Sequence, residues 1–365
     1  MKIKNLCSYA PKSKIKAGEA VENAKYLFFT SSTDENKRYT DFQFDKEAII
    51  MGTGGNATLH YYNGKFSVST DCLVLLPNSK IKCKYLYYFF KSHMSVLEAG
   101  FKGAGLKHTN KKYIEEININ EVPDLTTQEK IISHLDTISD NIEKLNRELE
   151  LFDSLTKDRF VEMFGDPEEN PFNWEKTLLT KVIINANNGM ARRGNDKDGN
   201  IVMRLVELQD GYIDYSNPNR IILKDNEKKR YLLKDKDFLF ARVNGNPDNV
   251  GRCAVFHDIG EDVYHNDHII RVHFDEELLN GTFASALFNS DYGKKQLKSQ
   301  IKTSAGQYTV SQDGIGAIAT ILPPAKLQNQ FADFVHQVDK SKLAVQKSLD
   351  KTQQLFDSLM QEYFG

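Results

Sequence analysis

The feature that most constrains the fold is a repeat within the chain. The segment Leu-Phe-Asp-Ser-Leu stands at 151–155 and returns at 355–359. A proline and a glutamine precede each copy, at Pro123 with Gln128 and at Pro323 with Gln328. Families of stacked short repeats have periods of about 20–50 residues, whereas this period is far longer. The sequence therefore predicts a duplicated domain.

Further matches extend the duplication toward the N-terminus. Residues 102–105 resemble 303–306, with isoleucine nine residues beyond the last glycine in each case. Residues 69–74 correspond to 265–270, which places Asp71 opposite Asp267. We divide the chain into a first module (1–122), a central helix (123–165), a second module (166–322) and a C-terminal helix (323–365).

Both predicted helices carry a narrow apolar stripe. Its spacing alternates between four and three residues, which is the a/d seam of a coiled coil. The seam residues are Ile131, Leu135, Ile138, Ile142, Leu145, Leu149 and Phe152 in the first helix, and Phe331, Val335, Val338, Val345, Leu349, Phe356 and Leu359 in the second. We expect the two helices to pair antiparallel as a rod, with Lys342 and Thr352 in the remaining seam positions fixing the register. The alternative is that each helix is an ordinary core helix of its own domain.

Composition limits the class of protein. With 365 residues and 40% apolar content, the chain is long and apolar enough for two or three globular cores. Its four cysteines are scattered, so neither a zinc site nor a disulfide framework is indicated. No run of about 18 apolar residues and no signal peptide is present, so we expect a cytoplasmic protein without a membrane partner.

The net charge of −2 conceals an uneven distribution. Residues 1–122 contain 18 Lys and Arg against 12 Asp and Glu, a net of +6, whereas 123–165 contain 5 against 10. Residues 166–322 contain 20 against 23, a net of −3. The first module could therefore attract a polyanion, whereas the second would need a local basic patch.

A loop rich in arginine and asparagine follows a strand-like run in the second module. Arginine can donate two hydrogen bonds to guanine and asparagine can pair with adenine, both in the major groove of DNA. The candidate base-reading residues are Arg242, Asn244, Asn246, Asn249 and Arg252. The alternative is a solvated turn in which asparagine and glycine only supply positive φ.

Other basic and polar loops suit phosphate oxygens, which position a protein without specifying sequence. The candidates are Arg192, Arg193, Lys302, Ser304, Gln307 and Tyr308 in the second module, and Lys107, His108, Lys111 and Lys112 in the first. We find no phosphate-binding loop, metal-binding pair of histidines or nucleophile elbow, so no catalytic or metal-binding residue is predicted.

The arrangement resembles the specificity subunit of type I restriction-modification systems. The resemblance lies in two variable modules, each followed by a heptad helix that begins with a proline and a glutamine. Sequence motifs at 237–242 and 323–332, and Pro171 with Trp174, also resemble the family. Four residues of the first module fit as further DNA contacts: Thr30, Ser31, Thr53 and Asn56. The first module departs from the second in being shorter and in lacking a counterpart of Trp174.

The resemblance implies an α+β fold, with two α/β target recognition domains separated by an antiparallel coiled coil. Each domain would read one half of a bipartite double-stranded DNA target, with the helices setting the spacing. It also implies two modification subunits as partners, which would bind S-adenosylmethionine and methylate adenines, and restriction subunits that carry the motor and nuclease. This chain would then be non-catalytic and hold no cofactor.

Two other functions stay open from the sequence alone. A self-sufficient DNA methyltransferase or nuclease would act without partners. A scaffold that binds proteins would not bind DNA. Salt-dependent DNA binding that is lost in an Arg242→Ala, Arg252→Ala variant would therefore exclude the scaffold.

Overall fold

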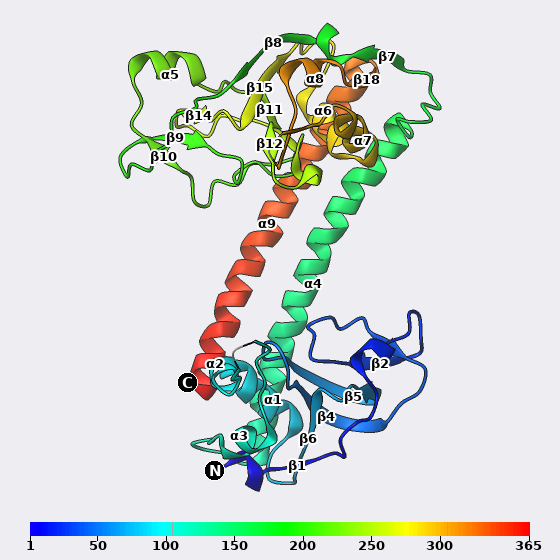
Figure 1. Cartoon of the computed structure of the whole chain (residues 1–365), viewed down its shortest axis with the longest axis vertical. Coiled ribbons are helices and arrows are strands. Elements are labelled where there is room, and N and C mark those ends of the chain that lie inside the picture. Colours follow the sequence, from blue (N-terminus) through cyan, green and yellow to red (C-terminus); the bar gives the residue numbers. More distant parts are fainter. Residues whose placement is uncertain (104, 305) are drawn as a thin grey trace. The chain divides into compact units, whose positions relative to one another are not determined.

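The computed structural model describes residues 1–103, 105–304 and 306–365, with Ser304 described by its backbone alone. The chain divides into two compact units (Figure 1). Unit 1 comprises Met1–Arg147 and Gln346–Gly365, and unit 2 comprises Glu148–Val345. Two 40-residue helices, α4 (Leu125–Phe164) and α9 (Ala325–Phe364), contribute to both units. The predicted class is confirmed: the protein is α+β, with two domains and a helical linker.

Unit 1 is built on one six-stranded sheet. In sheet order its strands are β1 (Cys7–Tyr9), β6 (Cys72–Pro77), β4 (Phe44–Gly52), β5 (Leu59–Val68), β2 (Tyr26–Phe29) and β3 (Arg38–Tyr39). All neighbours are antiparallel except β2 and β5, which run parallel. The unit also contains α1 (Cys83–Ser92), α2 (Met94–Ala99) and α3 (Lys111–Glu116).

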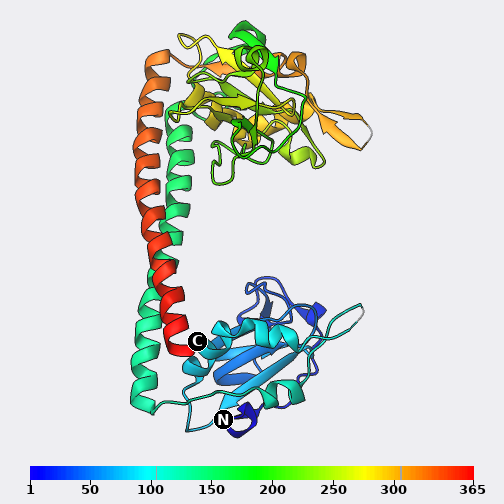
Figure 2. The same ribbon diagram turned by 90° about the vertical axis from the view of Figure 1, so that its left-hand side faces the viewer.

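The second half of the central strand β4 is buried on both faces. Ile49 and Met51 share one core with helix α1, which lies against the sheet in Figure 2. Ala48 and Ile50 belong to a second core on the other face of the sheet. Residues 48–51 form a continuous apolar run because neither face of this half of the strand meets solvent, whereas Asp45, Lys46 and Glu47 in the first half are exposed.

Unit 2 repeats this plan with the sheet divided. Its larger sheet has the order β13 (Cys253–Val255), β11 (Phe238–Ala241), β15 (Ile269–Phe274) and β8 (Ile183–Asn188). A second sheet has β10 (Arg220–Ile221), β9 (Asn200–Met203) and β14 (Val263–His265). The smaller sheets are β12 (Val243–Asn244) with β17 (Gln307–Thr309) and β16 (Lys302–Ser304), and β18 (Ala319–Leu322) with β7 (Glu175–Leu178). The helices are α5 (Asp225–Tyr231), α6 (Gly281–Asn289), α7 (Asp291–Ser299) and α8 (Gln312–Gly316).

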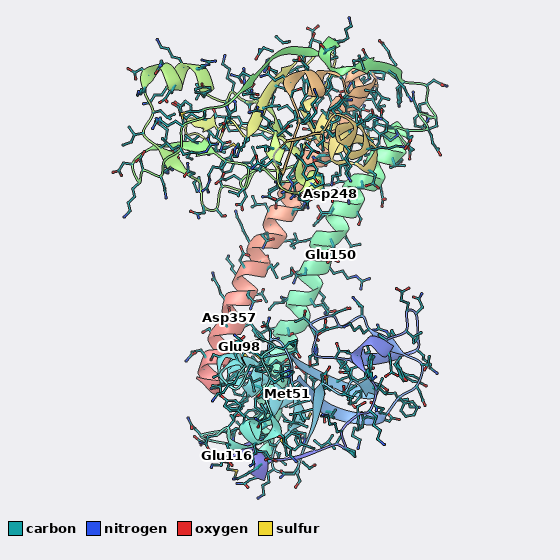
Figure 3. The ribbon with its side chains drawn as sticks, in the orientation of Figure 1. Met51, Glu98, Glu116, Glu150, Asp248 and Asp357 are labelled. Carbon is teal, nitrogen blue, oxygen red and sulfur yellow. The ribbon has the colours of Figure 1, made fainter. Side chains whose placement is uncertain are left out.

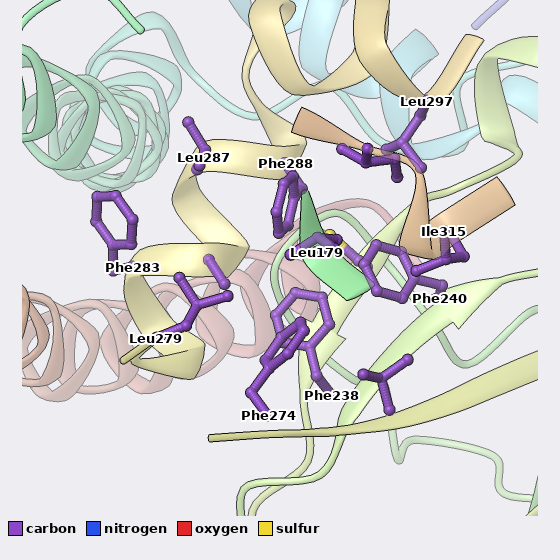
Figure 4. Close-up of a cluster of buried hydrophobic side chains, with 14 of the residues drawn as sticks. Leu179, Phe238, Phe240, Phe274, Leu279, Phe283, Leu287, Phe288, Leu297 and Ile315 are labelled. Carbon is purple, nitrogen blue, oxygen red and sulfur yellow. The ribbon is translucent and has the colours of Figure 1, made fainter. Parts of the chain in front are cut away.

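The main core of unit 2 is rich in phenylalanine. Phe238 and Phe240 of β11 pack against Phe288 of α6, with ring centroids 6.3 and 6.0 Å away (Figure 4). Leu239, the residue between them, belongs to the core on the opposite side of the strand. The period of two along β11 therefore supplies both cores.

The same hydrogen bonds fix the start of each long helix. Gln128 accepts from the Lys82 backbone N–H (2.8 Å) and donates to the carbonyls of Lys80 and Pro123. Gln328 accepts from the Asn280 N–H (2.9 Å) and donates to the carbonyls of Leu278 and Pro323. Both glutamine side chains are fully buried. The repeated proline–glutamine pair is therefore a device that ties each long helix to the start of α1 or α6.

The two long helices pair within each unit. In unit 1, Ile131 and Leu135 of α4 share a core with Phe356, Met360 and Phe364 of α9. The first part of α4 thus lies beside the last part of α9, which is the predicted antiparallel direction.

In unit 2 the last part of α4 lies beside the first part of α9. Phe160 and Phe164 stand edge-to-face against Phe331, with ring centroids 5.6 and 5.5 Å apart. Lys342 forms an ion pair with Asp153 at 2.6 Å. The predicted seam residues are buried or half-buried, whereas four apolar residues outside the seam are exposed: Leu151, Val161, Leu343 and Leu355. The seam assignment agrees with this pattern, and the predicted rod between the modules stays a prediction.

Backbone hydrogen bonds define the internal repeat more sharply than the sequence does. Thr53 N–H donates to the Asp71 carbonyl, and Arg242 N–H donates to the His268 carbonyl, both at 2.7 Å. Strands β6 and β15 begin directly after these acceptors. Asp71 therefore corresponds to His268, and the predicted pairing with Asp267 is wrong by one residue. The two segments differ in local sequence, so only the strand register could reveal the shift.

Candidate nucleic-acid interface

Unit 1 brings three of its candidate segments together at the end of β4. The Ser31 hydroxyl donates to the Asp71 carbonyl (2.8 Å) and accepts from the Thr53 N–H (3.2 Å). The Thr53 hydroxyl also donates to the Asp71 carbonyl, at 2.9 Å. The Gly55 N–H donates to the carbonyl of Lys107 (2.9 Å). One surface therefore carries the loops that contain Ser31, Thr53 and Lys107.

Unit 2 assembles the equivalent surface by equivalent contacts. His108 pairs with Gly54 in unit 1, and β17 pairs with β12 in unit 2 through Val243 and Thr309. Thr109 N–H donates to the Thr53 carbonyl, and Val310 N–H donates to the Arg242 carbonyl. In both units a hairpin therefore lies beside the loop that follows the central strand. In unit 2 this hairpin is β16–β17, with candidates Lys302, Gln307 and Tyr308; the side chain of Ser304 lies outside the described part.

Two of the candidate arginines in unit 2 are already bound by carboxylates. Arg192 makes two hydrogen bonds with Glu227 (3.1 and 2.8 Å), and this contact lowers the pKa of Glu227 to about 2. Arg193 forms an ion pair with Asp267 at 2.7 Å and lies 3.1 Å from Nε2 of His268. Burial lowers the pKa of His268, which favours the neutral ring. Neither arginine is a free cation in this conformation.

Arg252 is likewise engaged inside unit 2. Its guanidinium donates to Asp210 (3.0 Å), to Gln209 (3.0 Å) and to Asn249 (2.9 Å). Because most of its N–H donors are used in these bonds, Arg252 stabilises the loop and does not present a free guanidinium edge to a base. Arg242 donates one side-chain bond, to the Asp267 carbonyl at 3.1 Å, and its other side-chain donors have no acceptor within the described ranges.

The asparagines of this loop form turns, as the alternative interpretation predicts. The Asn244 side-chain oxygen accepts from the Asn246 N–H (2.9 Å), and that of Asn246 accepts from the Asp248 N–H (3.0 Å). Asp248, labelled in Figure 3, also pairs with Lys298 at 2.7 Å. The side-chain NH₂ groups of Asn244 and Asn246 have no protein acceptor among the described residues. The turn therefore positions two amide donors, which is compatible with base reading.

The first unit's candidates differ in access. Asn56, Lys107, His108 and Lys112 are exposed. Nζ of Lys111 lies 3.5 Å from Oε1 of Glu115 and above the ring of Tyr9. Thr30, by contrast, is only 2% exposed. Its hydroxyl accepts from Lys37 (3.2 Å) and faces away from solvent, so its predicted DNA contact does not agree with its position.

The structure places further basic residues beside these loops that the sequence interpretation missed. Arg204 occupies in unit 2 the position of Thr30, because β2 and β9 hold corresponding places beside β5 and β14. It pairs with the buried Glu207. In unit 1 the missed residues are Lys12, Lys14 and Lys16, all exposed. Their alternation in the sequence was a signal that could have identified them.

Features typical of other site classes are not found in the described residues. No group of three His, Cys, Asp or Glu there could hold a metal ion. No helix in the described ranges is long and apolar enough to cross a membrane. Burial raises the pKa of the Cys72 thiol to about 11 and that of Cys253 well above its ordinary value, so neither is an activated nucleophile.

Comparison with known families identifies similar proteins. Residues 1–151 match the family described as the type I restriction modification DNA specificity domain. The chain is 27% identical over 317 residues to the type I restriction enzyme StySPI specificity subunit of Salmonella potsdam, covering 82% of this chain and 68% of that one. It is 22% identical to the EcoKI specificity subunit of Escherichia coli K12, covering 87% and 73%.

A solved structure shares the fold. The crystal structure of the S subunit of a type I restriction-modification system from M. genitalium aligns with a TM-score of 0.69 at 16% identity. The alignment covers 100% of this chain and 95% of that one. At this identity the likeness concerns the fold alone.

Proposed function

We propose that this chain, which belongs to the family of type I restriction-modification DNA specificity subunits, reads one half of a bipartite DNA target with each of its two units. The chain is the DNA-recognition subunit of its complex and is not itself the enzyme. A self-sufficient methyltransferase or nuclease is not favoured, because the relatives are specificity subunits.

The observation that supports two reading units is the repeated loop assembly. In both units a hairpin is hydrogen-bonded beside the loop that follows the central strand. Because equivalent backbone contacts hold different side chains, the two units would read different bases with one geometry. Protein side chains distinguish all four base pairs in the major groove. Arg242 and the amide groups of Asn244 and Asn246 are among the donors of the described part of unit 2 that stay available for this reading.

Partners and cofactor follow as part of the proposal. Two modification subunits would bind S-adenosylmethionine and methylate an adenine in each half of the target, after turning the base out of the duplex. Restriction subunits would supply the motor and nuclease. No residue of this chain is assigned to catalysis or to a cofactor, and the complex would act in the cytoplasm.

The test is a map of methylated adenines in cells that express this chain with its partner modification subunits. We expect a motif of two specific half-sites separated by unspecified bases. An Arg242→Ala, Asn244→Ala variant should relax one half-site and leave the other unchanged. A motif without a gap, a change in both halves, or methylation by the purified chain alone would contradict the proposal.

A control variant leaves the loop of unit 2 intact and alters the corresponding hairpin of unit 1. Leu106→Ala in unit 1 alters an exposed side chain beside the other loop and should leave the half-site read by unit 2 unchanged. The same map in this variant therefore separates a local effect of Arg242 from a general loss of complex.

A further inference from the structure

Three lysines that alternate with covered residues form a basic edge on unit 1. Lys12, Lys14 and Lys16 are exposed, whereas the residues between them are covered. Ser13 is 6% exposed, and its hydroxyl oxygen accepts from the Gln43 side chain (2.9 Å) and from the Ile15 N–H (3.1 Å). Because Ser13 is held inward, the alternate lysines point outward. We call Lys12, Lys14 and Lys16 the lysine edge.

The lysine edge adjoins the loops of the proposed interface. The Ile15 carbonyl accepts from the Thr70 N–H at 2.7 Å. The next residue, Asp71, is the acceptor for both Ser31 and Thr53. A short path of backbone contacts therefore connects the lysine edge with the loop after β4.

The second unit has a counterpart of this segment. There the Met190 carbonyl accepts from the Asp267 N–H at 3.0 Å, and Asp267 corresponds to Thr70 in the structural repeat. The segment that contains Lys14 and Lys16 therefore corresponds to the segment that leads into Arg192 and Arg193. In this register Lys16 corresponds to Ala191, so the arginines of unit 2 follow directly after the counterpart of the lysine edge.

The charges at this position differ between the units. Glu227 and Asp267 neutralise Arg192 and Arg193 in unit 2. None of the ammonium groups of the lysine edge has an ion-pair partner in the parts of the chain that the structure describes. The difference matches the net charges of +6 for residues 1–122 and −3 for residues 166–322.

We infer that the lysine edge binds DNA phosphates beside the half-site read by unit 1, and that unit 1 supplies more of the salt-dependent affinity than unit 2. This inference rests on the proposed function. Flexible ammonium groups on an exposed edge suit phosphate oxygens, which carry no base identity. Binding releases counterions from the DNA, so affinity falls steeply with salt concentration. The lysine edge therefore contributes affinity and orientation, and the loops contribute sequence preference.

The test uses the full chain in complex with its modification subunits and the triple variant Lys12→Gln, Lys14→Gln, Lys16→Gln. Dissociation constants are measured over a range of salt concentrations, for a duplex with the mapped target and for an unrelated duplex. We expect both affinities to fall by a similar factor, roughly 10- to 100-fold at about 0.15 M salt. The slope of log K against log salt should become shallower by about 2 to 3.

A matched control removes three lysines of unit 1 that already have ion-pair partners. Lys2 and Lys4 pair with Glu116, which Figure 3 labels, and Lys82 pairs with Glu129. The variant Lys2→Gln, Lys4→Gln, Lys82→Gln changes net charge by the same amount and should leave the slope nearly unchanged.

The outcomes separate this inference from the proposed function. If the two triple variants lose affinity and slope equally, the lysine edge has no special role and the inference is wrong. If the lysine-edge variant changes the ratio between target and unrelated DNA, these residues read bases, and the phosphate assignment is wrong. If the unaltered complex binds no duplex, the proposed function itself fails. Equal thermal unfolding midpoints show that the variants are folded.

Discussion

Single side chains decide which parts of the interface are free to meet DNA. Sequence alone gives every arginine and lysine the same weight as a donor. In the structure, Arg192 and Arg252 are held by acidic or amide side chains, of which all but Asn249 lie 35 to 43 residues away in the chain. A bound cation must leave its partner before it can meet a phosphate, which lowers its net contribution. Arg242 and the lysine edge need no such exchange.

One buried histidine makes the stability of unit 2 depend on pH. His265 is fully buried, and burial lowers its pKa to about 4, against about 6.5 in an unfolded chain. As pH falls below about 6.5 the unfolded state takes up a proton that the folded state does not. The free energy of unfolding should therefore decrease between pH 6.5 and pH 4, by about 2 kcal/mol from pH 7 to pH 5.

Urea unfolding at pH 7 and pH 5 measures this loss. Trp174 is the only tryptophan of the chain, and its indole N–H donates to the Phe164 carbonyl in unit 2, so its fluorescence follows this unit. The variant His265→Gln should lose most of the pH dependence, whereas His257→Gln, at an exposed site, should retain it. An unchanged pH dependence in His265→Gln would show that another group is responsible.

At the scale of elements, the buried glutamines determine how each long helix starts. Replacing Gln328 by alanine removes the acceptor of the Asn280 N–H and the donor for two carbonyls. Because these backbone groups lie in a covered region, we expect a loss of roughly 2–4 kcal/mol in the free energy of unfolding. Urea unfolding followed by Trp174 fluorescence provides the measurement for unit 2.

The control for this prediction lies two residues along the same helix. Gln330→Ala changes an exposed glutamine and should cost less than about 0.5 kcal/mol. Gln128→Ala should cost as much as Gln328→Ala, measured by circular dichroism, because its three hydrogen bonds are equivalent. Similar small effects for Gln328→Ala and Gln330→Ala would contradict a role for the buried glutamine.

The elements were predictable where a local pattern determines them. The predicted helices, 123–165 and 323–365, agree with α4 and α9 within two residues, because the heptad pattern and the prolines are local signals. The parallel pairing of β2 with β5 and the partners of Arg252 depend on residues far apart in sequence. Such contacts have no local signature in the sequence. The loops could therefore be predicted, but not which of their donors are free and which are already engaged.

At the scale of the whole molecule, one structural plan serves two chemically different surfaces. The buried glutamine at the start of each long helix and the hairpin beside the loop after the central strand occur in both units. The charged residues at the interface differ between the units. Such a division lets the reading surfaces vary while the framework is kept. It also means that each unit can be altered without changing the other, provided that the long helices remain intact.

The proposed role of the helices in setting the spacing can be tested by lengthening them. Copying the heptads 141–147 and 339–345 in place adds seven residues to both α4 and α9 and preserves the apolar seam. Each helix grows by roughly 10 Å, and one base pair occupies about 3.4 Å of duplex. We expect methylation mapping to show both half-sites unchanged and the spacer longer by about one to three base pairs. Copying the heptad in α4 alone leaves the helices unequal and should abolish methylation. If the double insertion folds and methylates with the original spacer, the helices do not set the spacing.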